Sequence, residues 1–288
     1  MIRIYPLIFI LLWSSAFITT KPIVDNSDPF AALAFRFFFV ALGFYLFSFY
    51  LNQSLITNKR KIAESVLSGV LFHGFYLGGV FYSISIGMPV GIAALIVTLQ
   101  PILTNILSGP ILDEKITTQQ WIGVLLGFTG ASLVLGLDIG SGIPLLGLIA
   151  TIIALLSITI STIWQKKISK NLPLSVSNFY QAFGGCLFHV LIVILFAEPY
   201  INFNKVFIIA MSHQVLLVSF GAFTILMLLI KKNSASKTVS IFFLIPSTSA
   251  LMAWFFLNEK LTNLDIVGFI VTSLSLIHIS EPTRRSYI

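Results

Sequence analysis

The chain has 288 residues, of which 57% are hydrophobic and only 9% are charged, and its mean hydropathy is +0.99. The core of a soluble protein needs far fewer apolar residues than this, whereas a set of membrane-spanning helices would account for all of them. The net charge of +7 does not indicate nucleic-acid binding, because the basic residues form short clusters between apolar runs. The single cysteine, Cys186, excludes an intrachain disulfide and a cysteine-based metal site.

The first apolar run begins at Tyr5 and contains Ser14, Ser15 and Ala16, which resemble the end of a signal peptide. The run continues beyond these small residues to Lys21. We therefore expect a retained first helix rather than a cleaved leader.

Apolar runs of about 16 to 25 residues fill the chain and are separated by charged residues, Pro or Asn. They lack the alternating apolar and polar residues of β-barrel strands. A helix, by contrast, forms its backbone hydrogen bonds internally, as a segment inside a bilayer must. The sequence therefore predicts an all-α integral membrane protein with ten transmembrane helices. The predicted spans are residues 5–20, 29–50, 64–86, 90–112, 118–137, 144–164, 173–196, 206–230, 238–257 and 264–279.

Basic residues set the predicted orientation of these spans. With a cytoplasmic N-terminus, only Lys21, Lys205 and Lys260 fall outside. The larger set falls inside: Arg3, Lys59, Arg60, Lys61, Lys115, Lys166, Lys167, Lys170, Lys231, Lys232 and Lys237. This bias predicts a multi-pass protein of the cell (inner) membrane with both termini cytoplasmic.

Residues 101–124 and 246–269 have the same pattern, 145 positions apart. The matches include Pro101 with Pro246, and they continue without a gap through Leu112/Leu257, Glu114/Glu259, Lys115/Lys260, Thr117/Thr262 and Gly123/Gly268. The pattern predicts two repeats, over residues 5–137 and 144–279. Since each repeat has five spans, an odd number, the second would enter the membrane inverted relative to the first.

Several motifs resemble the drug/metabolite transporter superfamily, in particular its ten-helix group with two EamA-type repeats. They are Leu12-Trp13-Ser14-Ser15-Ala16-Phe17, Ala34-Phe35-Arg36-Phe37, Pro101 with Asp113-Glu114-Lys115-Ile116-Thr117, and Pro246 with Asn258-Glu259-Lys260-Leu261-Thr262. The resemblance covers residues 5 to about 273 and implies a transporter fold. It does not define a substrate, because the superfamily moves amino acids, nucleotide derivatives, sugars and xenobiotics. Ser14 departs from the usual glycine.

The C-terminal segment, residues 274–288, differs in character from the rest. Residues 274–284 resemble a translated sequencing adapter. We expect the native sequence to end near Ser273, with the tenth helix truncated and a non-native tail, and no functional role is assigned to this segment.

Pro101 and Pro246 lie inside apolar runs at matching positions of the two repeats. A proline removes one intrahelical hydrogen bond and clashes with the preceding turn, so each is expected to kink its helix. Matched kinks in inverted repeats indicate a central binding site. Gln100 and Asn105 add polar groups to the first of these helices, so all four residues are candidates for the substrate site.

Arg36 lies seven residues into the second span, roughly 10 Å below the outer surface. A guanidinium at that depth is costly unless it is paired or lines water. It could capture a substrate carboxylate or phosphate. The alternative, which the sequence favours, is a structural pair with Asp25 or Asp28, or snorkelling to the outer rim.

His73 is the only native titratable side chain expected deep in the membrane that could serve proton coupling, with Tyr76 one turn later on the same face. A histidine satisfied within the core is the preferred alternative. Trp13 lies near the middle of its span, where the interfacial aromatic belt does not explain it. It is therefore a candidate for an aromatic cavity wall.

These features favour a secondary transporter of small metabolites, amino-acid-like solutes or related compounds, working by alternating access, with export as the candidate direction. The sequence has no Gly-rich phosphate loop with Lys-Ser/Thr, so ATP is not expected to drive it. The alternatives are a membrane channel or a structural membrane protein and, less favoured, a membrane-embedded enzyme. Expected partners are the lipid bilayer and a small-molecule substrate; no cofactor, metal or nucleic acid is expected, and the protein would be a monomer or homodimer.

Overall fold

The computed structural model describes residues 4–56, 58–135, 143–196, 198–257 and 262–280. In these ranges the chain is helical, and the β contact present is an isolated bridge between Ser27 and Ile201. The helices are α1 (Tyr5–Val24), α2 (Pro29–Tyr50), α3 (Lys59–Gly69), η2 (Val70–Tyr76), α4 (Leu77–Ser85), α5 (Val90–Val97), α6 (Gln100–Leu112), α7 (Thr118–Leu135), α8 (Leu145–Ile168), α9 (Leu174–Phe196), α10 (Lys205–His213), η3 (Gln214–Ala222), α11 (Phe223–Lys232), α12 (Ala235–Val239), η4 (Ser240–Phe243), α13 (Leu244–Leu257) and α14 (Asn263–Ser280).

Eight helical stretches of the described chain are long and apolar enough to cross a membrane, and a shorter apolar helix covers Ile266–Ser275. Large apolar side chains cover their outer faces; Phe49 is 76% exposed and Ile194 is 73% exposed. Such surfaces are stable against lipid and not against water. The prediction of an all-α integral membrane protein is confirmed.

Within the described residues, each of the ten predicted apolar runs coincides largely with helix, although several runs are composite. The predicted third run comprises α3, η2 and α4, and the fourth comprises α5 and α6. The eighth comprises α10, η3 and α11, and the ninth comprises α12, η4 and α13. The expectation that residues 274–288 are non-native stays a prediction; α14 continues to Ser280, and the later residues lie outside the described chain.

Two π-helical segments occur at equivalent places in the two repeats. Adding 145 to the bounds of η2 gives residues 215–221, which lie inside η3. A π-helical turn widens the helix, is rare, and is often found at functional sites. The duplication seen in the sequence around the prolines therefore extends to a backbone feature that no sequence motif indicated.

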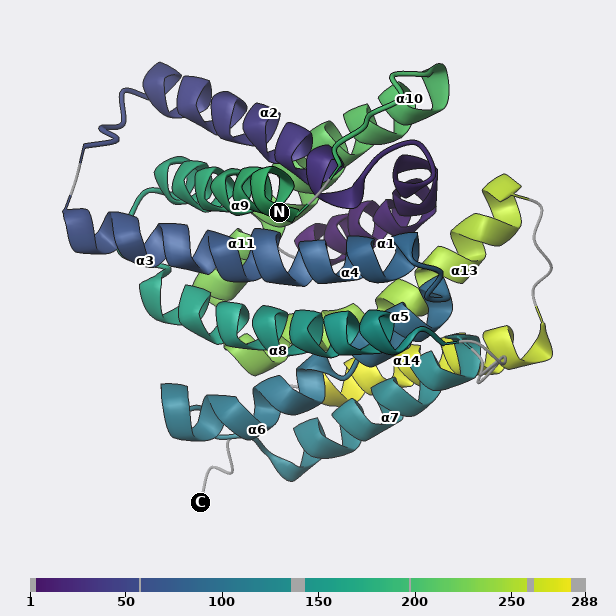
Figure 1. The fold of residues 1–288 in the computed structure, drawn as a ribbon. Coiled ribbons are helices and arrows are strands. Elements are labelled where there is room, and N and C mark those ends of the chain that lie inside the picture. Colours follow the sequence, from purple (N-terminus) through teal and green to yellow (C-terminus); the bar gives the residue numbers. More distant parts are fainter. Residues whose placement is uncertain (1–3, 57, 136–142, 197, 258–261, 281–288) are drawn as a thin grey trace.

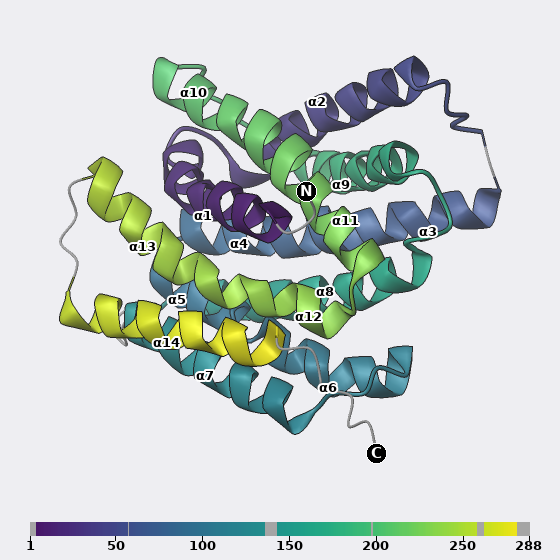
Figure 2. The ribbon, with the colours of Figure 1, turned by 180° about the vertical axis from the view of Figure 1, so that it is seen from behind.

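Contacts between the halves come in reciprocal pairs, with the helices side by side in both views (Figures 1 and 2). Helix α2 packs on its repeat equivalent α9, and α7 packs on its equivalent α14. Helix α1 packs on α13, and their equivalents, α8 and α6, also pack together. Such reciprocity is expected when two similar halves are related by an approximate two-fold axis.

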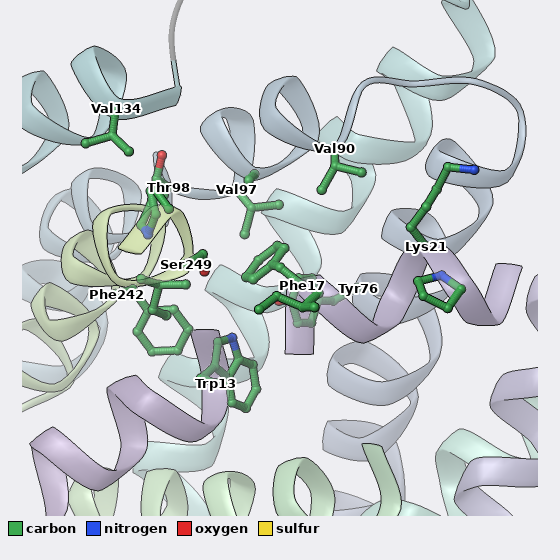
Figure 3. A pocket seen from close by; sticks show the side chains of 16 residues that line it. Trp13, Phe17, Lys21, Tyr76, Val90, Val97, Thr98, Val134, Phe242 and Ser249 are labelled. Carbon is green, nitrogen blue, oxygen red and sulfur yellow. The ribbon is translucent and has the colours of Figure 1, made fainter. Parts of the chain in front are cut away.

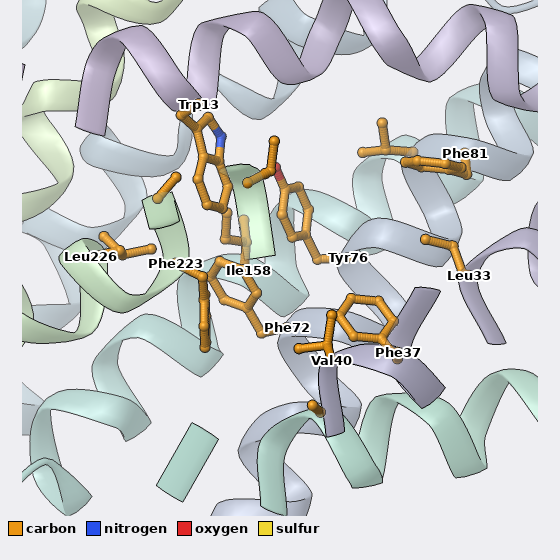
Figure 4. Packing of buried hydrophobic residues seen from close by; sticks show 14 of the residues in the cluster. Trp13, Leu33, Phe37, Val40, Phe72, Tyr76, Phe81, Ile158, Phe223 and Leu226 are labelled. Atoms are coloured by element: carbon orange, nitrogen blue, oxygen red, sulfur yellow. The ribbon is translucent and has the colours of Figure 1, made fainter. Parts of the chain in front are cut away.

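The core lies where the two halves meet. Figure 4 shows Trp13, Phe72 and Phe223 gathered in it, together with Phe37. The ring centroids of Phe72 and Phe223 are 5.2 Å apart, and those of Trp13 and Phe72 are 6.1 Å apart. These aromatic contacts join α1, η2 and α11, and thus bring residues of both repeats into one cluster.

Helices α7 and α14 approach closely at a pair of glycines. A Cβ on Gly130 would lie 2.8 Å from the carbonyl oxygen of Gly268, and a Cβ on Gly268 would lie 2.6 Å from that of Gly130. Small residues let membrane helices pack through close backbone contact. Gly130 and Gly268 therefore have a packing role between α7 and α14.

We expect Gly130→Ala to lower stability by about 1–3 kcal/mol, because the added methyl group would force α7 and α14 apart. Thermal unfolding of the detergent-purified protein would measure this loss. Gly109→Ala is the matched control, since the nearest atom to its Cβ would be 3.7 Å away. Equal unfolding temperatures for the two variants would contradict the close-packing explanation.

Candidate functional site

The first proline lies at a helix boundary rather than at a kink inside a continuous helix, which corrects the prediction for Pro101. Helix α5 ends at Val97, α6 begins at Gln100, and Pro101 occupies the first turn of α6. The Leu99 N–H bonds to the carbonyl of Ile96 at 3.1 Å, so the backbone tightens immediately before the proline. Pro101 has no N–H for the carbonyl of Val97, and the first turn of a helix tolerates this loss best.

The second repeat has a corresponding irregularity before Pro246. The 3₁₀ helix η4 precedes α13, and Pro246 is the third residue of α13. Subtracting 145 from the bounds of η4 gives residues 95–98, where α5 ends. Each repeat therefore interrupts regular α-helix just before its proline.

A large cavity of about 580 Å³ lies against these two interruptions (Figure 3). Val97 and Thr98 from the first interruption line it, as do Phe242 and Ile245 from the second. Its full lining is Trp13, Phe17, Ile18, Lys21, Pro22, Tyr76, Val90, Ala94, Val97, Thr98, Val134, Phe242, Ile245, Pro246, Ser249 and Ala250. The wall is mostly apolar with a few hydroxyl groups, which suits a small organic molecule.

The cavity reaches one end of the bundle. Lys21 lies near the end of α1, Val90 begins α5, and Val134 lies near the end of α7. Lys21 forms an ion pair with Asp25, which caps the C-terminal end of α1. We call this end, where α1 and α7 finish and α5 begins, the cavity end.

At the opposite end of the bundle, charged side chains bind helix termini. The carboxylate of Glu114 accepts hydrogen bonds from the N–H groups of Ala235 and Ser236, at 2.8 and 3.3 Å. The ammonium of Lys166 donates to the carbonyl of Ile230, at 3.0 Å, and to that of Asn233. An anion at a helix start and a cation at a helix end are both stabilised by the backbone dipoles. We call this group of contacts the terminal clamp.

In this clamp the Glu114 carboxylate caps the start of a helix. The helix it caps, α12, belongs to the other repeat. Its repeat equivalent, Glu259, lies outside the described residues.

A second, much smaller cavity of about 40 Å³ lies beside the large one and shares Trp13, Phe17 and Tyr76 with it. Its other polar lining residues are Thr20, Arg36, His73, Gln214 and Ser219. Four of the eight candidate residues, Trp13, Arg36, His73 and Tyr76, therefore line this small cavity. Pro246 lines the large one with Trp13 and Tyr76.

The remaining candidates, Gln100, Pro101 and Asn105, lie on neither of these two cavity walls. They are buried in α6, where Gln100 Nε2 donates to the Thr162 hydroxyl of α8 at 3.1 Å. The Gln100 Oε1, the Thr104 hydroxyl and both polar side-chain atoms of Asn105 have no protein hydrogen-bond partner. These residues, with Ser108, form a buried polar strip along one face of α6.

His73 is buried in the core and packed between aromatic rings. Its ring centroid lies 4.5 Å from those of Phe37 and Phe223. Its carbonyl is 2.9 Å from Nε2 of His189, whose ring lies in the same cluster. Its Nδ1 has no protein hydrogen-bond partner.

Several lining residues were not singled out by the sequence: Phe17, Thr98, Phe242 and Ser249. Two of them had a usable signal, because Thr98 and Phe242 lie three and four residues before the matched prolines. The turn that precedes a proline is the one that the proline distorts. Phe17 and Ser249 carry no comparable signal.

The family of the chain follows from comparison with known proteins. A model described as the EamA-like transporter family matches residues 3–136 and 145–280. The chain belongs to the EamA-like transporter family. This confirms the resemblance inferred from the motifs, and the protein is a membrane transporter with several spans.

Relatives and a solved structure agree with this assignment. The chain is 26% identical over 238 residues to the uncharacterized transporter YvbV of Bacillus subtilis (strain 168), covering 78% of this chain and 73% of the relative. It is 20% identical over 293 residues to a probable amino-acid metabolite efflux pump of Escherichia coli (strain K12), covering 94% and 91%. A crystal structure matches with a TM-score of 0.81 at 18% identity, over 97% of this chain and 96% of the other, which shows a shared fold.

We expect Ala94→Phe, which would fill part of the large cavity, to reduce transport at least tenfold while the protein still folds. Ala94 is 8% exposed and lines that cavity. Ala63→Phe on the exposed face of α3 is the matched control and should transport normally. Flux into proteoliposomes, with thermal unfolding as the folding check, would decide. Normal flux through Ala94→Phe would show that substrate does not pass through this cavity.

Proposed function

We propose that this EamA-family protein is a secondary transporter that moves a small metabolite by alternating access between two inverted five-helix repeats. The observation that carries this proposal is the large cavity, because its wall contains the helix interruptions of both repeats. Matched interruptions of spanning helices are the usual site of substrate binding in inverted-repeat transporters.

The proposed topology has ten spans in the inner membrane, with both termini in the cytoplasm. The reciprocal packing of α1 on α13 and of α8 on α6 supports an inverted relation between the repeats. In this topology the cavity end faces outward, and the terminal clamp faces the cytoplasm. Single cysteines placed at Lys61 or Lys231, after replacement of Cys186, should resist impermeant thiol reagents in intact cells. Rapid labelling from outside would reverse the orientation.

The structure would then represent a state that is open outward and closed toward the cytoplasm. Release of the terminal clamp would let the second repeat move away from α6. The polar strip of Gln100, Thr104, Asn105 and Ser108 would become hydrated and form the inner part of the path. Its unpartnered polar atoms support this role, because burial of such groups without partners costs about 1–3 kcal/mol each.

We propose that the substrate is amino-acid-like and that the physiological direction is export. One relative carries the name probable amino-acid metabolite efflux pump, and the cavity has a mostly apolar wall with the hydroxyls of Thr98 and Ser249. The eight residues predicted from the sequence would form the central site in the course of the cycle. Proton coupling through His73 remains part of the proposal, supported by its unpartnered Nδ1 beside the small cavity.

Counterflow in proteoliposomes tests this function against a channel or a purely structural role. Vesicles preloaded with unlabelled apolar amino acids should take up the labelled amino acid faster than empty vesicles, and uptake should saturate. A carrier exchanges its substrate across the membrane, whereas an open pore shows neither saturation nor stimulation from the far side. Flux without both signatures would contradict alternating access, and the absence of flux across an amino-acid panel would contradict the substrate class.

A further inference from the structure

Arg36 is a buried cation that no carboxylate neutralises within the described chain. Its side chain is in α2 and is only 3% exposed. The ion pairs of the described residues join Lys21 to Asp25 and Arg60 to Glu64. Asp28 instead accepts the Ala31 N–H at the start of α2, at 2.7 Å. The structural pair with Asp25 or Asp28, and snorkelling to the rim, are therefore wrong explanations of Arg36.

The protein uses only part of the hydrogen-bonding capacity of this guanidinium. Its Nε donates to the hydroxyl of Ser219 at 2.9 Å, and its Cζ lies 5.3 Å from the centre of the Phe37 ring. A guanidinium has five N–H donors arranged as a planar fork. The bond to Ser219 fixes the orientation of the fork and leaves its terminal amino groups for another acceptor.

The small cavity supplies the space for that acceptor. It is lined by Arg36, Ser219 and Gln214, and the Oε1 of Gln214 has no protein partner. A water molecule needs roughly 10–15 Å³ of such space, so about 40 Å³ holds a group with the size of a carboxylate and not a whole metabolite. The residues Trp13, Phe17 and Tyr76 border both cavities, so one ligand could extend from one cavity into the other.

We propose that Arg36 binds the carboxylate of the transported molecule in the small cavity, while the apolar body of that molecule occupies the large cavity. This inference rests on the proposed transport function and narrows its substrate class to small carboxylates with an apolar or aromatic body. A planar, bidentate guanidinium fork matches the two oxygens of a carboxylate. Ser219 orients the Arg36 guanidinium inside the membrane. A bound anion offsets the cost of burying the positive charge of Arg36, so the site discriminates strongly against uncharged analogues.

The charge preference of ligand binding tests the proposal directly. The probes are 3-phenylpropionate, its neutral amide and phenylpropylamine, which share one aromatic body and differ in the head group. Calorimetry on the full-length protein in lipid nanodiscs should show at least tenfold tighter binding of the carboxylate than of the amide. Arg36→Gln should remove this preference and leave weak binding of the amide unchanged.

Two further variants separate Arg36 from the other cation at the cavities. Arg36→Lys keeps the charge and loses the fork, so the carboxylate should remain preferred but bind more weakly. Lys21→Gln, at the end of the large cavity and already paired with Asp25, should retain the wild-type preference. Phenyl phosphate should bind more weakly than the carboxylate, because its head group is larger than the small cavity admits.

Several outcomes would overturn the proposal. They are equal binding of carboxylate and amide by the wild type, retention of the preference in Arg36→Gln, or its loss in Lys21→Gln. Stronger binding of phenyl phosphate would assign the site to phosphate esters instead. None of these results affects the counterflow assay, so a failure here is distinguishable from a failure of the proposed transport function.

Discussion

The missing N–H of one proline in each repeat is the constraint on which the site depends. Inside a bilayer no water replaces a lost backbone hydrogen bond, so a helix must adjust its turns where a proline interrupts it. In this chain α5 gives way to α6 before Pro101, and the 3₁₀ helix η4 precedes Pro246. Both adjustments lie beside the large cavity. The position of this cavity therefore follows from the duplicated proline positions.

Charged side chains make the two ends of the helical bundle differ, and they also make the two similar repeats differ. Glu114 and Lys166 bind the start of α12 and the end of α11 at the clamped end. At the equivalent place of Arg36 the second repeat has Gln181, whose Oε1 lies 3.0 Å from Nε2 of Gln165. The unpaired cation thus belongs to one half only. Because the charge is in one repeat and not in the other, a ligand can bind in a single orientation. A site with identical groups in both repeats would not select one orientation.

The architecture was largely predictable from the sequence, and the detailed site was not. The lengths of the apolar runs predicted the helices, and the 145-residue spacing of the repeats identified the matched prolines. Both features can be read directly along the linear sequence. The π-helical segments η2 and η3 have no sequence signature of comparable strength, and the position of Arg36 relative to Ser219 depends on how α2 packs against the other repeat. The same holds for Gln100 and Asn105, whose polarity was evident but whose burial against α8 came from packing.

We propose that one cavity, built from two equivalent helix interruptions, opens alternately to the two sides of the membrane. Spin-label distances measured in lipid would test it, with one pair at Lys115 and Lys237 beside the terminal clamp and another at Asp25 and Asn263 at the cavity end. Adding a transported substrate should lengthen the first distance in part of the population and shorten the second in the same proportion. Distances that stay fixed, or that change independently of each other, would contradict alternating access in this protein.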